Sequence, residues 1–136
     1  MKRSIFLLSL LFLFVGCKSD SKRVWFVDSP DGKTVTLPLT LKFGVEGMDL
    51  VPAGERPNDP KAGHHHIIVD GDAIPFGTII TMDNPKWLHY GKAQTEATLT
   101  AKELPKGKHK LTLQFADWEH KSYGTTLSKT INIVVE

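Results

Sequence analysis

The sequence has a single cysteine in 136 residues, Cys17, close to its N-terminus. If this thiol is acylated, the mature protein has no free thiol, which excludes disulfides, thiolate metal sites and a cysteine nucleophile. The chain also lacks a nucleophile elbow, a His-Glu-x-x-His pattern and a phosphate-binding loop. An enzyme is therefore the least supported class, and nothing in the sequence selects a substrate.

The N-terminal segment has the pattern of a secretory signal. Lys2 and Arg3 precede an apolar run over residues 5–15 that only Ser9 interrupts. This run is too short to span a bilayer, which takes about 20 residues, and it has the anatomy of a signal peptide. Cys17 lies where a lipoprotein signal peptidase would leave it as the new N-terminus.

We therefore predict a lipoprotein signal peptide over residues 1–16, a lipidated tether over 17–23 and one domain over 24–136. The lipobox is imperfect, because Phe14 lies three residues before the cysteine, where leucine is usual. The alternatives are a simple secretory signal with a coincidental cysteine, or an uncleaved anchor.

The charge of the expected mature chain is balanced. Without Lys2 and Arg3, 15 basic residues face 15 acidic ones. A neutral domain anchored to a membrane through Cys17 is a poor nucleic-acid binder. Lys18, directly after the cysteine, is not the aspartate that retains many lipoproteins in the inner membrane. We expect the bacterial cell envelope, and in a cell with two membranes the periplasmic or surface face of the outer membrane.

No stretch has a sustained helical period, and short alternating segments predict strands instead. Residues 37–45, for example, alternate between apolar and polar side chains. The seven expected strands are 24–27, 37–45, 64–70, 78–81, 95–101, 109–115 and 131–135. Long connections over 47–63 and 82–94 separate some of them. The pattern predicts an all-β fold, an immunoglobulin-like β-sandwich.

Three consecutive histidines, His64, His65 and His66, lead directly into the apolar segment 67–69. Because side chains alternate along a strand, His64 and His66 are expected on one face and His65 on the other. Two imidazoles spaced in this way can converge on one metal ion. The stretch lies too far inside the chain to be a purification tag.

Immunoglobulin-like topology brings further histidines to the same end of the domain. The connection 82–94 carries His89, and the loop after strand 109–115 carries His120. Both loops lie at the end of the sandwich where the strand containing His64 begins. His109 begins a strand at the opposite end, where we interpret it as a structural residue that hydrogen-bonds the backbone of the corner 104–107.

Several motifs together resemble DUF4399, a bacterial domain of unknown function. They are residues 47–48, 52–54, 63–70, 89–96 and 104–111, which read GM, PAG, GHHHIIVD, HYGKAQTE and LPKGKHKL. The resemblance covers roughly residues 24–135. One departure is Ala93, where the family usually has glycine. The resemblance implies an exported β-domain and no established activity.

Our first hypothesis is a transition-metal site at the histidine-rich end of the domain. The expected ligands are His64, His66, His89 and His120, with Met48 as a further candidate. An all-imidazole site without thiolate suits Cu(II) or Zn(II). Asp117 or Glu96 could orient an imidazole from outside the ligand set.

The second hypothesis is a binding module for a small molecule or protein that uses no metal. Its expected contacts are Trp87, Gln94, Glu96 and Trp118. A purely structural alternative stands beside both hypotheses. In it, the histidines are polar packing residues, and Trp87 and Trp118 cap the end of the core.

Overall fold

The computed structural model describes residues 21–136. The predicted signal peptide and Cys17, the predicted acylation site, lie outside the described residues. Within them the elements are β1 (Arg23–Val27), β2 (Thr34–Val35), β3 (Leu39–Glu46), β4 (Asp49–Leu50), β5 (Ala62–Val69), β6 (Trp87–Tyr90), β7 (Glu96–Leu99), β8 (Gly107–Ala116), the 3-10 helix η1 (Gly124–Leu127) and β9 (Ser128–Val135). In this part of the chain, no helix has both the length and the apolar character needed to cross a bilayer.

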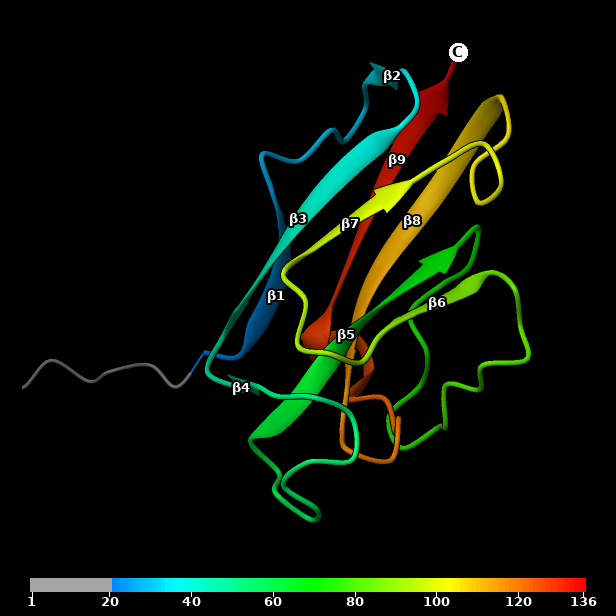
Figure 1. The fold of residues 1–136 in the computed structure, drawn as a ribbon. Helices are drawn as coiled ribbons and strands as arrows, with labels where there is room; N and C mark the ends of the chain where they lie inside the picture. Colours follow the sequence, from blue (N-terminus) through cyan, green and yellow to red (C-terminus); the bar gives the residue numbers. More distant parts are fainter. Residues whose placement is uncertain (1–20) are drawn as a thin grey trace, which may run out of the picture.

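The strands form two sheets that face each other (Figure 1). One has the order β1-β3-β7, and the other has the order β2-β9-β8-β5-β4, with β6 also paired to β5. The predicted strands 37–45 and 95–101 are neighbours in the smaller sheet, and 64–70, 109–115 and 131–135 are neighbours in the larger one. This is the distribution that an immunoglobulin-like sandwich requires. The predicted fold class is confirmed.

The main apolar core lies between the sheets. It includes Phe43 and Leu99 from the smaller sheet and Leu113 and Ile131 from the larger one, each at most 3% exposed. Alternation explains the arrangement, because every second side chain of β3 and β7 points inward and the intervening ones meet solvent. β5 and most of β8 are instead buried on both faces.

The second face of β5 is covered by the chain between β5 and β6. Ile74 and Ile80 from this connection pack with Ile68 and Ala116 in a second apolar cluster. Backbone hydrogen bonds from Gly77 to Ser122 (2.8 Å) and from Ile80 to His120 (2.9 Å) tie the connection to the loop after β8. The outer face of β5 is therefore interior, which matters for the histidines that stand on it.

Two predictions about this region are wrong. Residues 78–81 are not a strand, because Ile79 makes only an isolated bridge with Lys121 while Ile80 is used for packing. The expected connection 82–94 instead contains β6, which pairs antiparallel with β5. The physical reason is tertiary: β5 offers a free edge to the segment 87–90, whereas the more apolar segment 78–81 covers the sheet face.

Candidate metal centre

The three consecutive histidines lie on β5 with alternating orientation, as predicted. The ring of His65 faces the main core, with its centre 5.2 Å from that of Phe43 and 5.0 Å from that of Phe115. His64 and His66 lie on the opposite face, with ring centres 4.8 Å apart. All three side chains are at most 1% exposed.

Two further histidines reach the outer face of β5 from distant parts of the chain. In the β5–β6 ladder, His89 is the partner of His66. His120 belongs to a tight turn in which the Asp117 carboxylate accepts hydrogen bonds from the backbone N–H groups of Glu119 and Lys121, both at 2.9 Å. The backbone of His120 has a left-handed φ of 67°, a strained conformation for this residue type of the kind found at functional sites.

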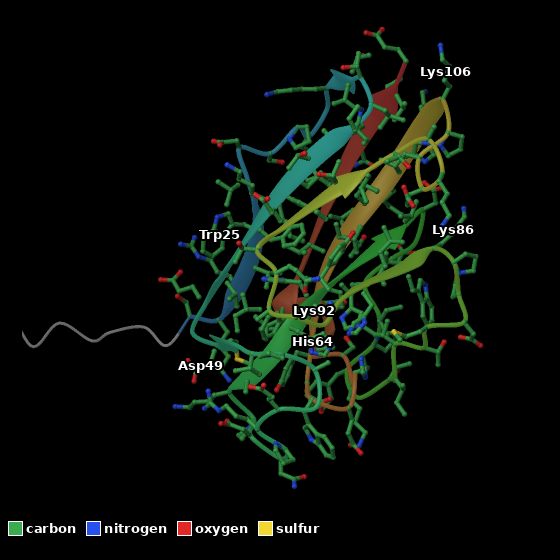
Figure 2. The ribbon with its side chains drawn as sticks, viewed as in Figure 1. Trp25, Asp49, His64, Lys86, Lys92 and Lys106 are labelled. Carbon is green, nitrogen blue, oxygen red and sulfur yellow. The ribbon has the colours of Figure 1, made fainter. Side chains whose placement is uncertain are left out.

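The four imidazoles form one compact group. One nitrogen from each of His64, His66, His89 and His120 can be chosen so that all four atoms lie within 4.8 Å of one another. The Nε2 atoms of His89 and His120 are 3.1 Å apart. His64 lies where β5 meets the surrounding loops, far from Lys106 at the other end of the domain (Figure 2). This cluster could hold a metal ion.

The environment keeps the imidazoles of His64, His66 and His89 neutral. Burial, followed by repulsion from the neighbouring imidazoles, lowers the pKa of His66 to about 2 and that of His64 to about 3. Burial also lowers the pKa of His89, with a further contribution from His120. A metal-ligating imidazole must be unprotonated at the bound nitrogen, so these side chains are in the ligand form at neutral pH.

The buried imidazoles have unsatisfied polar atoms. Among residues 21–136, neither ring nitrogen of His64, His65 or His66 has a hydrogen-bond partner. A neutral imidazole carries one donor and one acceptor, and each buried polar group left unpaired costs about 1–3 kcal/mol. On the outer face, a nitrogen of each of two such rings lies within 4.8 Å of nitrogens of His89 and His120, an arrangement that suits a ligand set.

One residue near His89, Gly91, shapes the site, and the sequence analysis assigned it no such role. A Cβ added to Gly91 would lie 2.2 Å from Cε1 and Nε2 of His89, so the absence of a side chain gives that ring its place. Ala93, two residues further along the chain, has a left-handed φ of 57°.

The other predicted site residues have separate surroundings. Met48 belongs to the main core, and Glu96 is exposed on β7, in the smaller sheet. Gln94 accepts a hydrogen bond from the backbone N–H of Lys92 at 2.6 Å. Trp87 packs against the second apolar cluster, and Trp118 borders a hollow of about 260 Å³ that Phe76 and Tyr123 also line.

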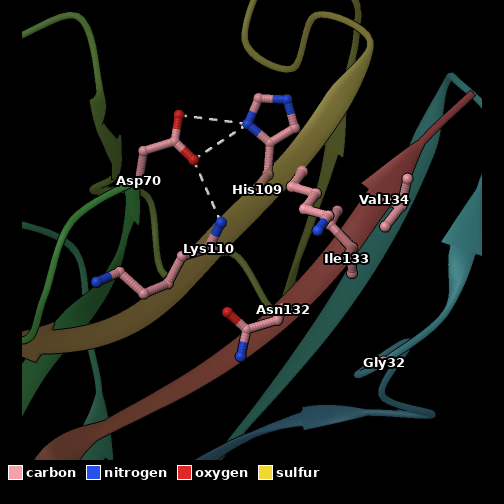
Figure 3. Close-up of a pocket in the computed structure, with 8 residues that line it drawn as sticks. Gly32, Asp70, His109, Lys110, Asn132, Ile133 and Val134 are labelled. Carbon is pink, nitrogen blue, oxygen red and sulfur yellow. Dashed lines mark hydrogen bonds and ion pairs between the residues drawn. The ribbon is translucent and has the colours of Figure 1, made fainter.

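His109 lies apart from the cluster, because it is near the start of β8 whereas His64 pairs with Ala116 at the end of that strand. Figure 3 shows its ring beside Asp70. Its Nε2 donates to the carbonyl oxygen of Pro105 at 2.6 Å, and its Nδ1 lies 3.1 Å from Oδ1 of Asp70. Asp70 also accepts the backbone N–H of Lys110 at 3.2 Å. The predicted hydrogen bond to the corner backbone is confirmed, and both ring nitrogens are engaged by protein oxygens.

Residues 41–136, more than half of the chain, match the family DUF4399, described as a domain of unknown function. The chain belongs to this family. The resemblance on which the sequence analysis relied is thereby confirmed. No curated protein matches the sequence.

One solved structure with a similar fold is the endo-beta-1,4-mannanase from Thermotoga petrophila. The match has a TM-score of 0.50 and 14% sequence identity, and it covers 90% of this chain but 21% of the mannanase chain. This domain therefore spans about a fifth of that enzyme's length. At this level of identity the likeness concerns the fold alone.

Proposed function

We propose that this DUF4399 domain binds one transition-metal ion, copper or zinc, through His64, His66, His89 and His120. The observation that carries the proposal is the convergence of four imidazoles from three chain segments, with ligand atoms within 4.8 Å of one another. Imidazole is a good ligand for both metals. Two of the rings are fully buried and have no other partner among the described residues.

Packing alone is a weaker account of this cluster. The neighbouring histidines lower the proton affinity of His64 and His66. These two residues also stand where aliphatic side chains would continue the row that Ile68 begins on this face of β5. Replacing buried unpaired polar groups by apolar ones usually stabilises a protein or leaves its stability unchanged. A bound ion would satisfy one nitrogen of each ring.

We further propose that the protein is a lipoprotein of the bacterial envelope, anchored to a membrane through acylated Cys17. The support is the sequence itself: Lys2 and Arg3, the apolar run 5–15 and the position of the only cysteine. Mass spectrometry of the N-terminal peptide is expected to find an acylated cysteine at position 17. A Cys17→Ala variant is expected to keep its signal peptide and to carry no lipid.

Metal content is the direct test of the binding proposal. Untagged full-length protein, extracted in detergent, is loaded with Zn(II) or Cu(II), desalted and analysed by elemental mass spectrometry. We expect close to one ion per chain in the native protein and loss of most of it in a His64→Ala/His66→Ala variant. A native protein that retains no stoichiometric metal after desalting would overturn the proposal.

A further inference from the structure

The spacing of the four rings distinguishes between coordination geometries. The six distances between ring centres fall between 4.8 and 5.7 Å, and five of them lie between 4.8 and 5.1 Å. The longest joins His66 and His120. The four rings are therefore nearly equidistant, as the corners of a tetrahedron are.

A tetrahedral ion accounts for these distances. With a Zn–N bond of about 2.05 Å and a ring centre about 1.1 Å beyond the nitrogen, tetrahedral coordination places every pair of ring centres about 5.1 Å apart. A square plane with the same bond length would give about 4.5 Å for four pairs and about 6.3 Å for the two opposite pairs. The longest observed distance is 5.7 Å, between His66 and His120.

The ligand set is also complete. Structural zinc sites are closed by four protein ligands, whereas catalytic sites use three and keep the fourth position for water or substrate. His64 and His66 are fixed on the central strand β5, His89 on β6 and His120 on the turn that follows β8. The four candidate ligands therefore come from three segments, and together they supply the four ligands that a closed site requires.

We infer that this centre is a closed tetrahedral site for Zn(II), which holds the ion without exposing a coordination position to a substrate. The inference rests on the proposed metal binding, and it adds the coordination geometry, the identity of the ion and a structural rather than catalytic role. Cu(II) and Ni(II) prefer square-planar coordination, so a tetrahedral site disfavours both ions. Cu(I) prefers thiolate and thioether ligands, so four imidazoles are a poorer match for Cu(I) than for Zn(II). Hydrolysis at the ion is not expected, because no position is left for a water molecule.

Cobalt substitution tests the geometry. Full-length protein stripped with a chelator receives one equivalent of Co(II), which absorbs visible light strongly when four-coordinate and weakly when six-coordinate. We expect intense visible bands that one equivalent of Zn(II) removes. Weak bands from a protein that nevertheless binds cobalt would overturn the tetrahedral site and leave metal binding intact. Failure to bind cobalt, zinc or copper would overturn both.

Competition tests the choice of ion. With equimolar Zn(II) and Ni(II), we expect bound zinc to exceed bound nickel at least tenfold, and equal or greater nickel would overturn the inference. Displacement of Zn(II) by equimolar Cu(I) under anaerobic, reducing conditions would overturn the assignment to zinc.

A single-ligand variant tests the closed coordination shell. His120→Asn removes one imidazole while keeping a residue that tolerates the left-handed backbone. We expect zinc affinity to fall at least tenfold and the visible spectrum of the cobalt form to shift as water takes the fourth position. His65→Leu, on the opposite face of β5, is the control and should change neither reading. An unchanged cobalt spectrum in folded His120→Asn protein would exclude His120 as a ligand and overturn the closed site.

Discussion

The Nε2 atoms of His89 and His120 lie 3.1 Å apart, although the two residues are 31 positions apart in the sequence. At this distance two N–H groups would oppose each other, so at least one nitrogen must present its lone pair. The pair is therefore compatible with a hydrogen bond between neutral rings or with joint ligation of a metal ion. The two rings cannot both be protonated imidazolium ions in this arrangement, so the arrangement depends on pH.

We expect the metal-free protein to lose stability in mild acid. Burial lowers the pKa of His65 to about 4, of His64 to about 3 and of His66 to about 2, while the unfolded chain titrates near 6.5. The unfolded state then binds more protons below pH 6.5, so stability is complete above that pH and falls as the pH decreases towards these values. Together, the three residues are expected to reduce the free energy of unfolding by about 3–4 kcal/mol between pH 6 and pH 5.

The measurement is urea unfolding of the chelator-treated protein at pH 7, 6 and 5. One equivalent of zinc should shift the loss to lower pH, because protons must then compete with the ion for the ligands. A free energy of unfolding that stays constant from pH 7 to pH 5 would contradict the assignment of these rings as neutral and buried.

Substitutions at the neighbouring positions His65 and His66 on β5 distinguish a histidine that only packs from one that binds the metal. We expect His66→Leu to stabilise the metal-free protein by about 1–3 kcal/mol, because it removes a buried imidazole that has no hydrogen-bond partner. The same variant should lose its bound zinc. His65→Leu should give a similar gain and keep the zinc, because its ring packs between Phe43 and Phe115. Urea unfolding with and without zinc checks both, and zinc loss in His65→Leu would argue against the assigned faces.

Gly91→Ala should weaken metal binding while preserving the fold. The new Cβ would lie 2.2 Å from Cε1 and Nε2 of His89, so the ring would have to move, and a side chain can move aside where a backbone cannot. We expect zinc affinity to fall by about tenfold, or about 1.4 kcal/mol, with near-native circular dichroism. Gly54→Ala is the control for substituting a glycine: no atom lies within 4 Å of its added Cβ, although its φ of 81° makes the change strained. Equal zinc affinity in Gly91→Ala and native protein would show that the ring of His89 is not constrained in this way.

Ala93→Gly should stabilise the domain by about 0.5–1 kcal/mol. Ala93 has a left-handed φ of 57°, which costs an alanine about 1–2 kcal/mol, and glycine recovers most of this after its greater loss of chain entropy. Ala101→Gly is the matched control, because Ala101 is exposed and is not among the residues with positive φ. Equal effects of the two substitutions on the free energy of unfolding would contradict the strain argument.

The predictable part of the site follows from periodicity and topology. Alternation alone places His64 and His66 on one face of β5 and His65 on the other, and sandwich topology brings His89 and His120 to the same end. The sequence could not predict β6, because Trp87–Tyr90 forms a strand only through its pairing with β5. It also predicted a strand wrongly at 78–81, where Ile80 packs against a sheet face and the segment does not pair with a sheet edge. The steric role of Gly91 depends on the rotamer of His89, which no local pattern contains.

The positions of the four histidines along the chain have a consequence for how the domain is held together. The proposed ligands span residues 64 to 120, and the expected mature protein has no cysteine thiol for a disulfide. A bound ion would act as a reversible cross-link over this span, and in chain-entropy terms a link between these two positions restricts the unfolded state by roughly 4 kcal/mol. Metal supply would then set how long the folded domain persists, as oxidation does for disulfide-linked proteins.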